Sequence, residues 1–132
     1  MSIQVMAKAQ TITKKDTVYY LVDTIKVPDN DRMIEIGIEG DFYCYRLMCQ
    51  CYPNQTNPVF TYIRHRKGIS LTNIQLSKIK LINLKTLIRL AALHGITPKK
   101  NVAYFFIEYK NKQPICHEVV LLNPQVRIKL IN

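Results

Sequence analysis

A short cationic run is the part of the sequence best suited to chemistry with anions. Residues 64–71 read Arg-His-Arg-Lys-Gly-Ile-Ser-Leu, so three fixed positive charges and a histidine precede a glycine turn. A helical pattern follows from Thr72. Cationic side chains at a close backbone turn, beside the start of a helix, can hold a phosphate chain. These residues by themselves leave open an alternative, a basic surface loop before a helix.

The distribution of charge favours a polyanionic partner. The net charge of the 132 residues is +10. Residues 1–43 hold five basic and seven acidic side chains, a net of −2, whereas residues 44–132 hold fourteen basic and two acidic side chains, a net of +12. An excess this uneven usually faces a polyanion. Nucleic acid is the first candidate, and an anionic membrane surface is the second.

Residues 42–67 are predicted to form a β-hairpin with a binding face. By strict alternation, one face of its second strand carries two aromatic and two arginine side chains, namely Phe60, Tyr62, Arg64 and Arg66. If this face registers with the face of the first strand that carries Phe42 and Arg46, rings and arginines interleave. Bases can stack on such rings, each contributing roughly 1–3 kcal/mol. The opposite face of the first strand is predicted to be core: Tyr43, Tyr45, Leu47 and Cys49.

Little in the sequence favours catalysis, a metal or a cofactor. The acidic residues show no paired-carboxylate pattern, and no Gly-rich phosphate loop, HExxH or nucleophile elbow is present. A non-enzymatic protein without a cofactor is therefore expected. A nuclease is the third alternative. Cys49-x-Cys51 is too tight for a usual zinc knuckle, and buried free thiols are expected. A metal site using His65, His117 or Cys116 remains an open alternative.

The elements that must position the cationic run are mostly strands. No stretch of 18 apolar residues and no signal-peptide core occur, so no membrane span and an intracellular location are expected. Segments of β-branched and aromatic residues, bounded by turn signals, predict eight strands, at residues 3–12, 17–27, 33–38, 42–52, 59–67, 102–109, 115–122 and 125–131.

One long helix is predicted over residues 72–94, ending at Gly95 and Pro98. The apolar positions that define its main face include Leu76, Ile79, Leu87 and Leu90. Its apolar arc is wider than one sheet needs to cover, so a second helix is expected to pack on it from another subunit of a homodimer. A helix buried deeply within one domain is the alternative.

The run Arg66-Lys67-Gly68-Ile69-Ser70-Leu71-Thr72, followed by Gln75 and Lys78 or Lys80, resembles the single-stranded-DNA-binding domain of the transcriptional coactivator positive cofactor four. Tyr45-Arg46 after Gly40 resembles the family's glycine turn and Arg-bearing strand. The resemblance covers roughly residues 33–90. It implies a curved antiparallel sheet crossed by a helix, dimerisation through the helices, and Arg46, Arg66, Lys67 and Gly68 on the DNA face.

The sequence therefore predicts an α+β fold, with a curved antiparallel β-sheet, one long helix packed across it and an extra C-terminal β-hairpin. A single nucleic-acid-binding domain is expected over residues 1–132, with a coactivator-like core at about 33–94 and a β extension at 95–132. A second, degraded repeat in that extension, giving an internal pseudo-dimer, is left open.

The predicted function is single-stranded nucleic-acid binding in transcription or replication. The transcription or replication machinery is an expected partner. If the source is eukaryotic, the expected location is the nucleus or a viral replication site. A viral or divergent member of the resembled family would suit the many Ile, Asn, Lys and Tyr residues. The expected interface consists of Arg46, Phe60, Tyr62, Arg64, Arg66, Lys67 and Gly68. The alternative is a dimeric protein-interaction scaffold whose basic face binds an acidic partner or a membrane surface.

Overall fold

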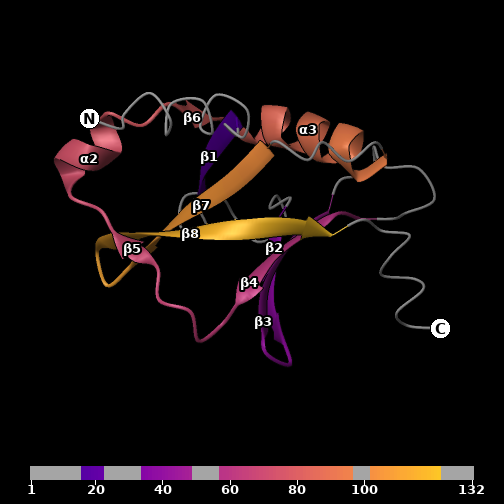
Figure 1. Ribbon diagram of the computed structural model, residues 1–132, viewed down its shortest axis with the longest axis horizontal. Helices are drawn as coiled ribbons and strands as arrows, with labels where there is room; N and C mark the ends of the chain where they lie inside the picture. The colour runs from indigo at the N-terminus through magenta and orange to yellow at the C-terminus, as the bar shows by residue number, and fades with distance from the viewer. Residues whose placement is uncertain (1–15, 23–33, 49–56, 97–101, 123–132) are drawn as a thin grey trace, which may run out of the picture.

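The computed structural model describes residues 16–22, 34–48, 57–96 and 102–122, which form a curved mixed sheet flanked by short helices (Figure 1). The described strands are β1 Asp16–Val22, β2 Ile34–Glu39, β3 Phe42–Leu47, β4 Val59–Ile63, β5 Ile69–Ser70, β6 Leu81–Ile82, β7 Val102–Lys110 and β8 Gln113–Leu122. The described helices are α2 Asn73–Ser77 and α3 Leu84–Ile96. The predicted strands at 3–12 and 125–131 lie outside the described residues.

The sheet is mixed rather than antiparallel, which corrects the expected fold. Its strand order is β2-β3-β4-β8-β7-β1-β6, with β5 paired to β8 beside this path. β1 runs parallel to both β7 and β6, while the other pairings are antiparallel. The β7–β8 hairpin, predicted as a C-terminal addition, lies in the middle of the sheet because β8 pairs with β4 and β7 pairs with β1.

The prediction of one long helix over residues 72–94 is wrong, because the chain becomes extended at β6. α2 begins at the N-cap Thr72, whose side chain accepts the Gln75 N–H in a capping box, and it ends at Lys78. Asn83 then caps α3 by accepting the Thr86 N–H through Oδ1 at 2.8 Å. Between the two caps, β6 pairs with β1, so its backbone groups are satisfied by the sheet instead of by a helix.

Several of the apolar side chains that suggested a dimer helix pack against the two opposite faces of one sheet. Phe106 and Ile107 are consecutive in β7 and therefore point to opposite faces. Leu87 of α3 lies in the cluster with Phe106, whereas Leu76 and Ile79 pack against the cluster that contains Ile107. The remaining member of the expected dimer surface, Leu90, is half-buried. Part of the apolar surplus is thus buried in two cores within the chain, whereas Ile74, Leu81 and Leu93 are exposed, and the homodimer stays a prediction.

Neither described helix is a candidate membrane span. Among the described residues, no helix has the length and apolar character needed to cross a bilayer.

Candidate nucleic-acid interface

The cationic run forms an excursion between two strands that pair with the same edge of β8. Thr61 of β4 is paired with Val120, and Ile69 of β5 is paired with Cys116. The two paired residues are eight positions apart on the β4–β5 side (61 to 69), but their partners on β8 are only four positions apart (120 to 116). Four additional residues therefore loop out of the sheet between β4 and β5. The segment 64–67 projects from the sheet for this reason, and this projection was not evident from the sequence.

The backbone of this 64–67 loop is fixed at both ends. The Arg64 N–H donates to the Asp41 carbonyl oxygen in the β2–β3 turn at 2.9 Å, and the Arg66 N–H donates to the Ile63 carbonyl at 2.9 Å. From the other side, His117 of β8 donates through Nε2 to the carbonyl oxygen of Arg66 at 3.1 Å. This bond sets the tautomer, because a carbonyl can only accept. The loop is therefore held in one conformation before any ligand arrives.

Gly68 closes the loop against β8 where a side chain would not fit. A Cβ at this position would lie 2.5 Å from Ile115 Cγ2, 2.7 Å from His117 Cε1 and 2.8 Å from the Cys116 carbonyl oxygen. A positive φ is found at Gly40 among the described glycines, not at Gly68. The requirement for glycine thus comes from the close approach of β8, and not from a left-handed backbone.

Within the described ranges, the loop presents its charges to solvent without acidic partners. All four of its side chains are exposed: Arg64, His65, Arg66 and Lys67. In the described part of the chain, no ion pair involves them, and the Arg64 guanidinium makes a long 3.4 Å contact to the Gly40 carbonyl. Unpaired, exposed cations on a fixed backbone are suited to bind phosphates.

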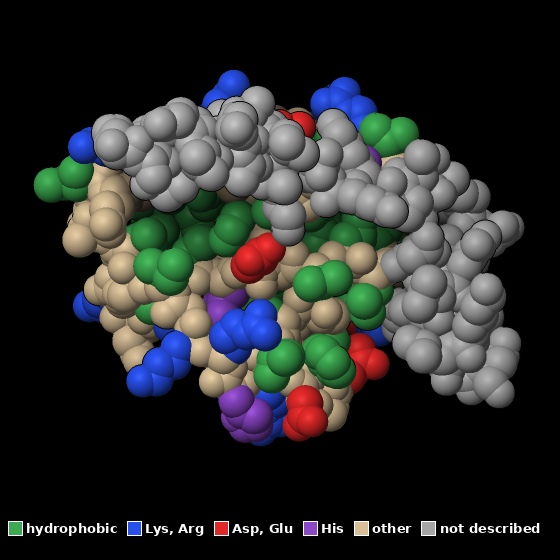
Figure 2. Space-filling model, viewed as in Figure 1, with side chains coloured by type: hydrophobic (Ala, Val, Ile, Leu, Met, Phe, Trp, Pro, Cys, Tyr) green, Lys and Arg blue, Asp and Glu red, His purple; other side chains and the backbone are tan. Residues whose placement is uncertain are grey.

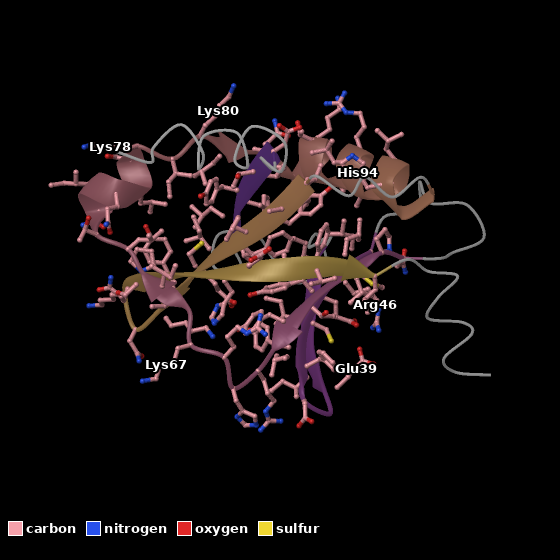
Figure 3. All side chains as sticks on the ribbon, viewed as in Figure 1. Glu39, Arg46, Lys67, Lys78, Lys80 and His94 are labelled. Atoms are coloured by element: carbon pink, nitrogen blue, oxygen red, sulfur yellow. The ribbon has the colours of Figure 1, made fainter. Side chains whose placement is uncertain are left out.

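Arg46 does not join these cations. Its Nη1 lies 3.0 Å from Glu35 Oε1 and its Nη2 lies 3.3 Å from Glu39 Oε2, so two carboxylates on β2 neutralise it. Figure 3 shows Arg46 and Lys67 far apart on the molecule. Arg46 remains a predicted contact from the resemblance, but its charge is already compensated within the chain.

The expected interleaving of rings and arginines is not formed, because the register places the rings in the core. Phe60 is paired with Tyr45 and Tyr62 with Tyr43, and residues opposite each other in an antiparallel pair share a face. Phe60 and Tyr62 are only 0% and 5% exposed. The core prediction for Tyr45 is confirmed, and Phe60 and Tyr62 join it there, so no base can stack on them in this fold.

Tyrosines of the β3–β4 hairpin instead converge on Glu108 of β7. Tyr45 donates its hydroxyl to Glu108 Oε1 at 2.8 Å, and Tyr43 approaches the same carboxylate at 3.3 and 3.4 Å. Burial first, and then the negative charge of Glu108, raise the pKa of both Tyr45 and Tyr43 well above the ordinary range. The two hydroxyls are therefore neutral donors that tie the hairpin to β7 on one face of the sheet.

His117 connects this cluster to the cationic loop. Its ring stacks on Tyr62 with centroids 3.8 Å apart and an angle of 10° between the planes. Lys110 contacts the Tyr62 hydroxyl at 3.4 Å and lies 5.1 Å from the centroid of the Tyr43 ring. Burial lowers the pKa of His117, and the charge of Lys110 acts in the same direction, while the bond to the Arg66 carbonyl opposes them.

We expect the stability of the fold to decrease on mild acidification because of His117. Its pKa in the folded state lies below the ordinary value of 6.5, so the unfolded chain binds the proton first as the pH falls. The contribution of neutral His117 is complete above pH 6.5 and is lost as the pH falls through the lowered pKa. Urea unfolding from pH 7.5 to 5 should give a smaller loss for His117→Gln than for the wild type. Equal losses would contradict this assignment.

The cysteine and histidine residues do not gather into a metal site among the residues that are described. Cys44 and Cys116 are buried free thiols, as predicted, and Cys49 and Cys51 lie outside the described residues. Cys116 and His117 are neighbours in β8 and point to opposite faces of the sheet. No group of three or more His, Cys, Asp or Glu residues in the described ranges has a geometry that could hold an ion.

Comparison with known proteins finds no relative for this chain. No protein-family model matches it, and no curated protein or solved structure is significantly similar to it.

Proposed function

We propose that this protein binds single-stranded nucleic acid, with the 64–67 loop as the site of phosphate contact. The observation that carries the proposal is the four-residue excursion from the β8 edge, whose exposed basic side chains make no ion pair with any acidic residue that the structure describes. A polyanion gains most from such a site because the loop backbone is already ordered, so little conformational entropy is lost on binding. The net charge of +10 adds long-range attraction to the same partner.

The preference for single strands is supported by the resemblance of residues 66–72 to the coactivator domain. A role in transcription or replication is part of that proposal. The test is binding to a fluorescent oligonucleotide, single-stranded and duplex, at two salt concentrations. Tighter binding to the single strand, weakened steeply by salt, is the expected result. Equal or tighter binding to duplex would overturn the preference, and the absence of salt-dependent binding to either form would favour the protein-interaction scaffold.

Replacing Arg66 and Lys67 together by Ala is expected to weaken binding and flatten its salt dependence. Removing one cation from a phosphate should reduce the slope of log affinity against log salt by about 0.7 for a single strand. Both side chains are exposed, so the melting temperature should not change.

The matched control is the double variant Lys78→Ala and Lys80→Ala, which removes the same charge from a different part of the molecule. These lysines are exposed and lie well away from Lys67 (Figure 3). The control should retain most of the affinity and slope. If both double variants lose the same affinity, net charge is responsible and the 64–67 loop is not a site.

A further inference from the structure

An exposed aromatic side chain lies beside the cationic loop, at Phe42. Phe42 is paired with Ile63, the residue that immediately precedes the loop, and the Arg64 N–H bonds to Asp41, the residue before Phe42. Phe42 is 47% exposed, and Ile63 is 41% exposed. In the space-filling view, hydrophobic side chains lie next to basic and histidine side chains at the lower end of the molecule, where β3 and β4 project (Figure 2).

The Phe42 ring is available for a ligand, unlike the other rings of the hairpin. Phe42 and Tyr43 are consecutive in β3, so they point to opposite faces, and Tyr43 faces the core. Tyr43, Tyr45, Phe60 and Tyr62 each pack against other rings, whereas no ring contact among the described residues involves Phe42. An apolar ring that is half in water gains free energy when a flat partner covers it.

We infer that Phe42 is the stacking platform for an unpaired base, while the 64–67 loop holds the neighbouring phosphates. This inference rests on the proposed function and identifies the feature that would select single strands, because a base within a duplex has no free face to offer. Ile63, beside the ring on the same face, widens the apolar surface under the base.

The acidic residues near Phe42 favour a base over a phosphate at this position. Asp41 is exposed and precedes Phe42, and Glu39, paired with Phe42 across the β2–β3 hairpin, is bound to Arg46. A phosphate at Phe42 would be repelled by Asp41, whereas a neutral base would not. Charge therefore divides the surface into a part for the base at Phe42 and a part for the backbone at the loop.

The same exposed side chains would suit a protein partner if they formed a larger apolar patch. Further exposed apolar side chains on this face are Val120 of β8, which is paired with Thr61, and Ile69 of β5, which follows the loop and is paired with Cys116. These side chains lie next to cations that make no ion pair among the described residues, and this mixture matches a nucleotide better than a hydrophobic protein interface, whose centre is depleted of charge.

The test measures the affinity of the wild type and of Phe42→Ala for each of two oligomers. An oligothymidine of about 15 nucleotides is compared with an abasic oligomer of the same length, which has the same phosphates but no bases. For the wild type, we expect the abasic oligomer to bind on the order of 5- to 150-fold more weakly. Phe42→Ala should lose a similar factor toward oligothymidine, lose little toward the abasic oligomer, and keep the wild-type salt slope.

Two further variants make the result specific to the Phe42 ring. Phe42→Tyr keeps a flat ring and should retain most of the affinity. Tyr109→Ala removes an aromatic side chain of similar exposure, 44%, beside Pro114 at the β7–β8 turn, and should bind like the wild type. Circular dichroism and melting of each variant establish that the fold is retained.

The outcomes separate this inference from the proposed function. If the wild type binds both oligomers with a steep salt slope but Phe42→Ala binds oligothymidine as tightly as the wild type does, stacking at Phe42 is overturned and phosphate binding stands. If neither oligomer binds the wild type, the proposed function itself fails. A loss in Phe42→Ala that is equal for both oligomers would show that Phe42 supports the loop instead of a base, and would also overturn the inference.

Discussion

Gly68→Ala should destabilise the protein by about 3 kcal/mol, the upper end of what overpacking of a tight site usually costs. The added methyl group would meet Ile115 and His117 side-chain atoms, which can shift, and the Cys116 carbonyl oxygen, which belongs to the central strand β8 and cannot. Alanine also restricts the unfolded chain, which favours the folded state by about 0.4–1 kcal/mol. The clash with the backbone is the larger effect, so the net result is destabilising.

Gly37→Ala provides the matched control. A Cβ at Gly37 would have no atom within 4 Å, and its φ is not positive. This variant should be neutral or slightly more stable than the wild type. Urea unfolding at neutral pH measures both free energies of unfolding. Gly68→Ala with wild-type stability would mean that the chain does not approach β8 this closely, and the ordered backbone of the 64–67 loop would then lose its support.

Glu108→Ala is expected to reduce the free energy of unfolding by about 2–3 kcal/mol, because the Tyr45 hydroxyl would lose its acceptor in a site that water barely reaches. The Tyr43 hydroxyl would lose the same acceptor but is only half-buried, so water can replace it at lower cost. The variant also removes the link between the β3–β4 hairpin and β7, and the loop that this hairpin carries should become less ordered.

Glu118→Ala is the control for the loss of a carboxylate. Glu118 is exposed on β8, and its removal should change stability little. A second measurement identifies the mechanism: in spectrophotometric titration, ionisation of the tyrosines should begin at a lower pH in Glu108→Ala, since burial and, second, the negative charge of Glu108 raise the pKa values of Tyr43 and Tyr45. Loss of stability without this change would indicate general disruption of packing. Wild-type stability would contradict the role assigned to the cluster.

Residue types and turn signals were sufficient to predict most of the described strands. Segments of β-branched and aromatic residues bounded by turns correspond to β1, β2, β3, β4, β7 and β8, with differences of a few residues at their ends. The hairpins β3–β4 and β7–β8 were also predictable, because each joins two such segments through a local connection. The basic character of residues 64–67 was likewise a local property of the sequence.

The helix over residues 72–94 was predicted incorrectly because its apolar residues pack on two different faces of the sheet and together mimic the spacing of one continuous helix. Apolar residues recur at helical spacing through residues 81–82, and the signals that end α2 and begin α3 are single polar residues, Lys78 and Asn83. Nothing local distinguishes this stretch from a continuous helix. The stretch became a strand because β1, about 60 residues earlier in the chain, offers its edge to residues 81 and 82.

By itself the sequence determined the six longer described strands, β1, β2, β3, β4, β7 and β8, and where the charge lies, including the basic residues 64–67, but not the two-residue strands β5 and β6. Tertiary structure decided which side of each strand is buried. Alternation separates Tyr62 from Ile63 and Phe42 from Tyr43, but it does not say which member of each pair faces inward. Pairing of Tyr45 with Phe60 and of β4 with β8, set by contacts between segments distant in the chain, buried Phe60 and Tyr62 and left Phe42 beside the loop. The same distant pairing looped out residues 64–67, because β4 and β5 meet β8 with four residues to spare between them.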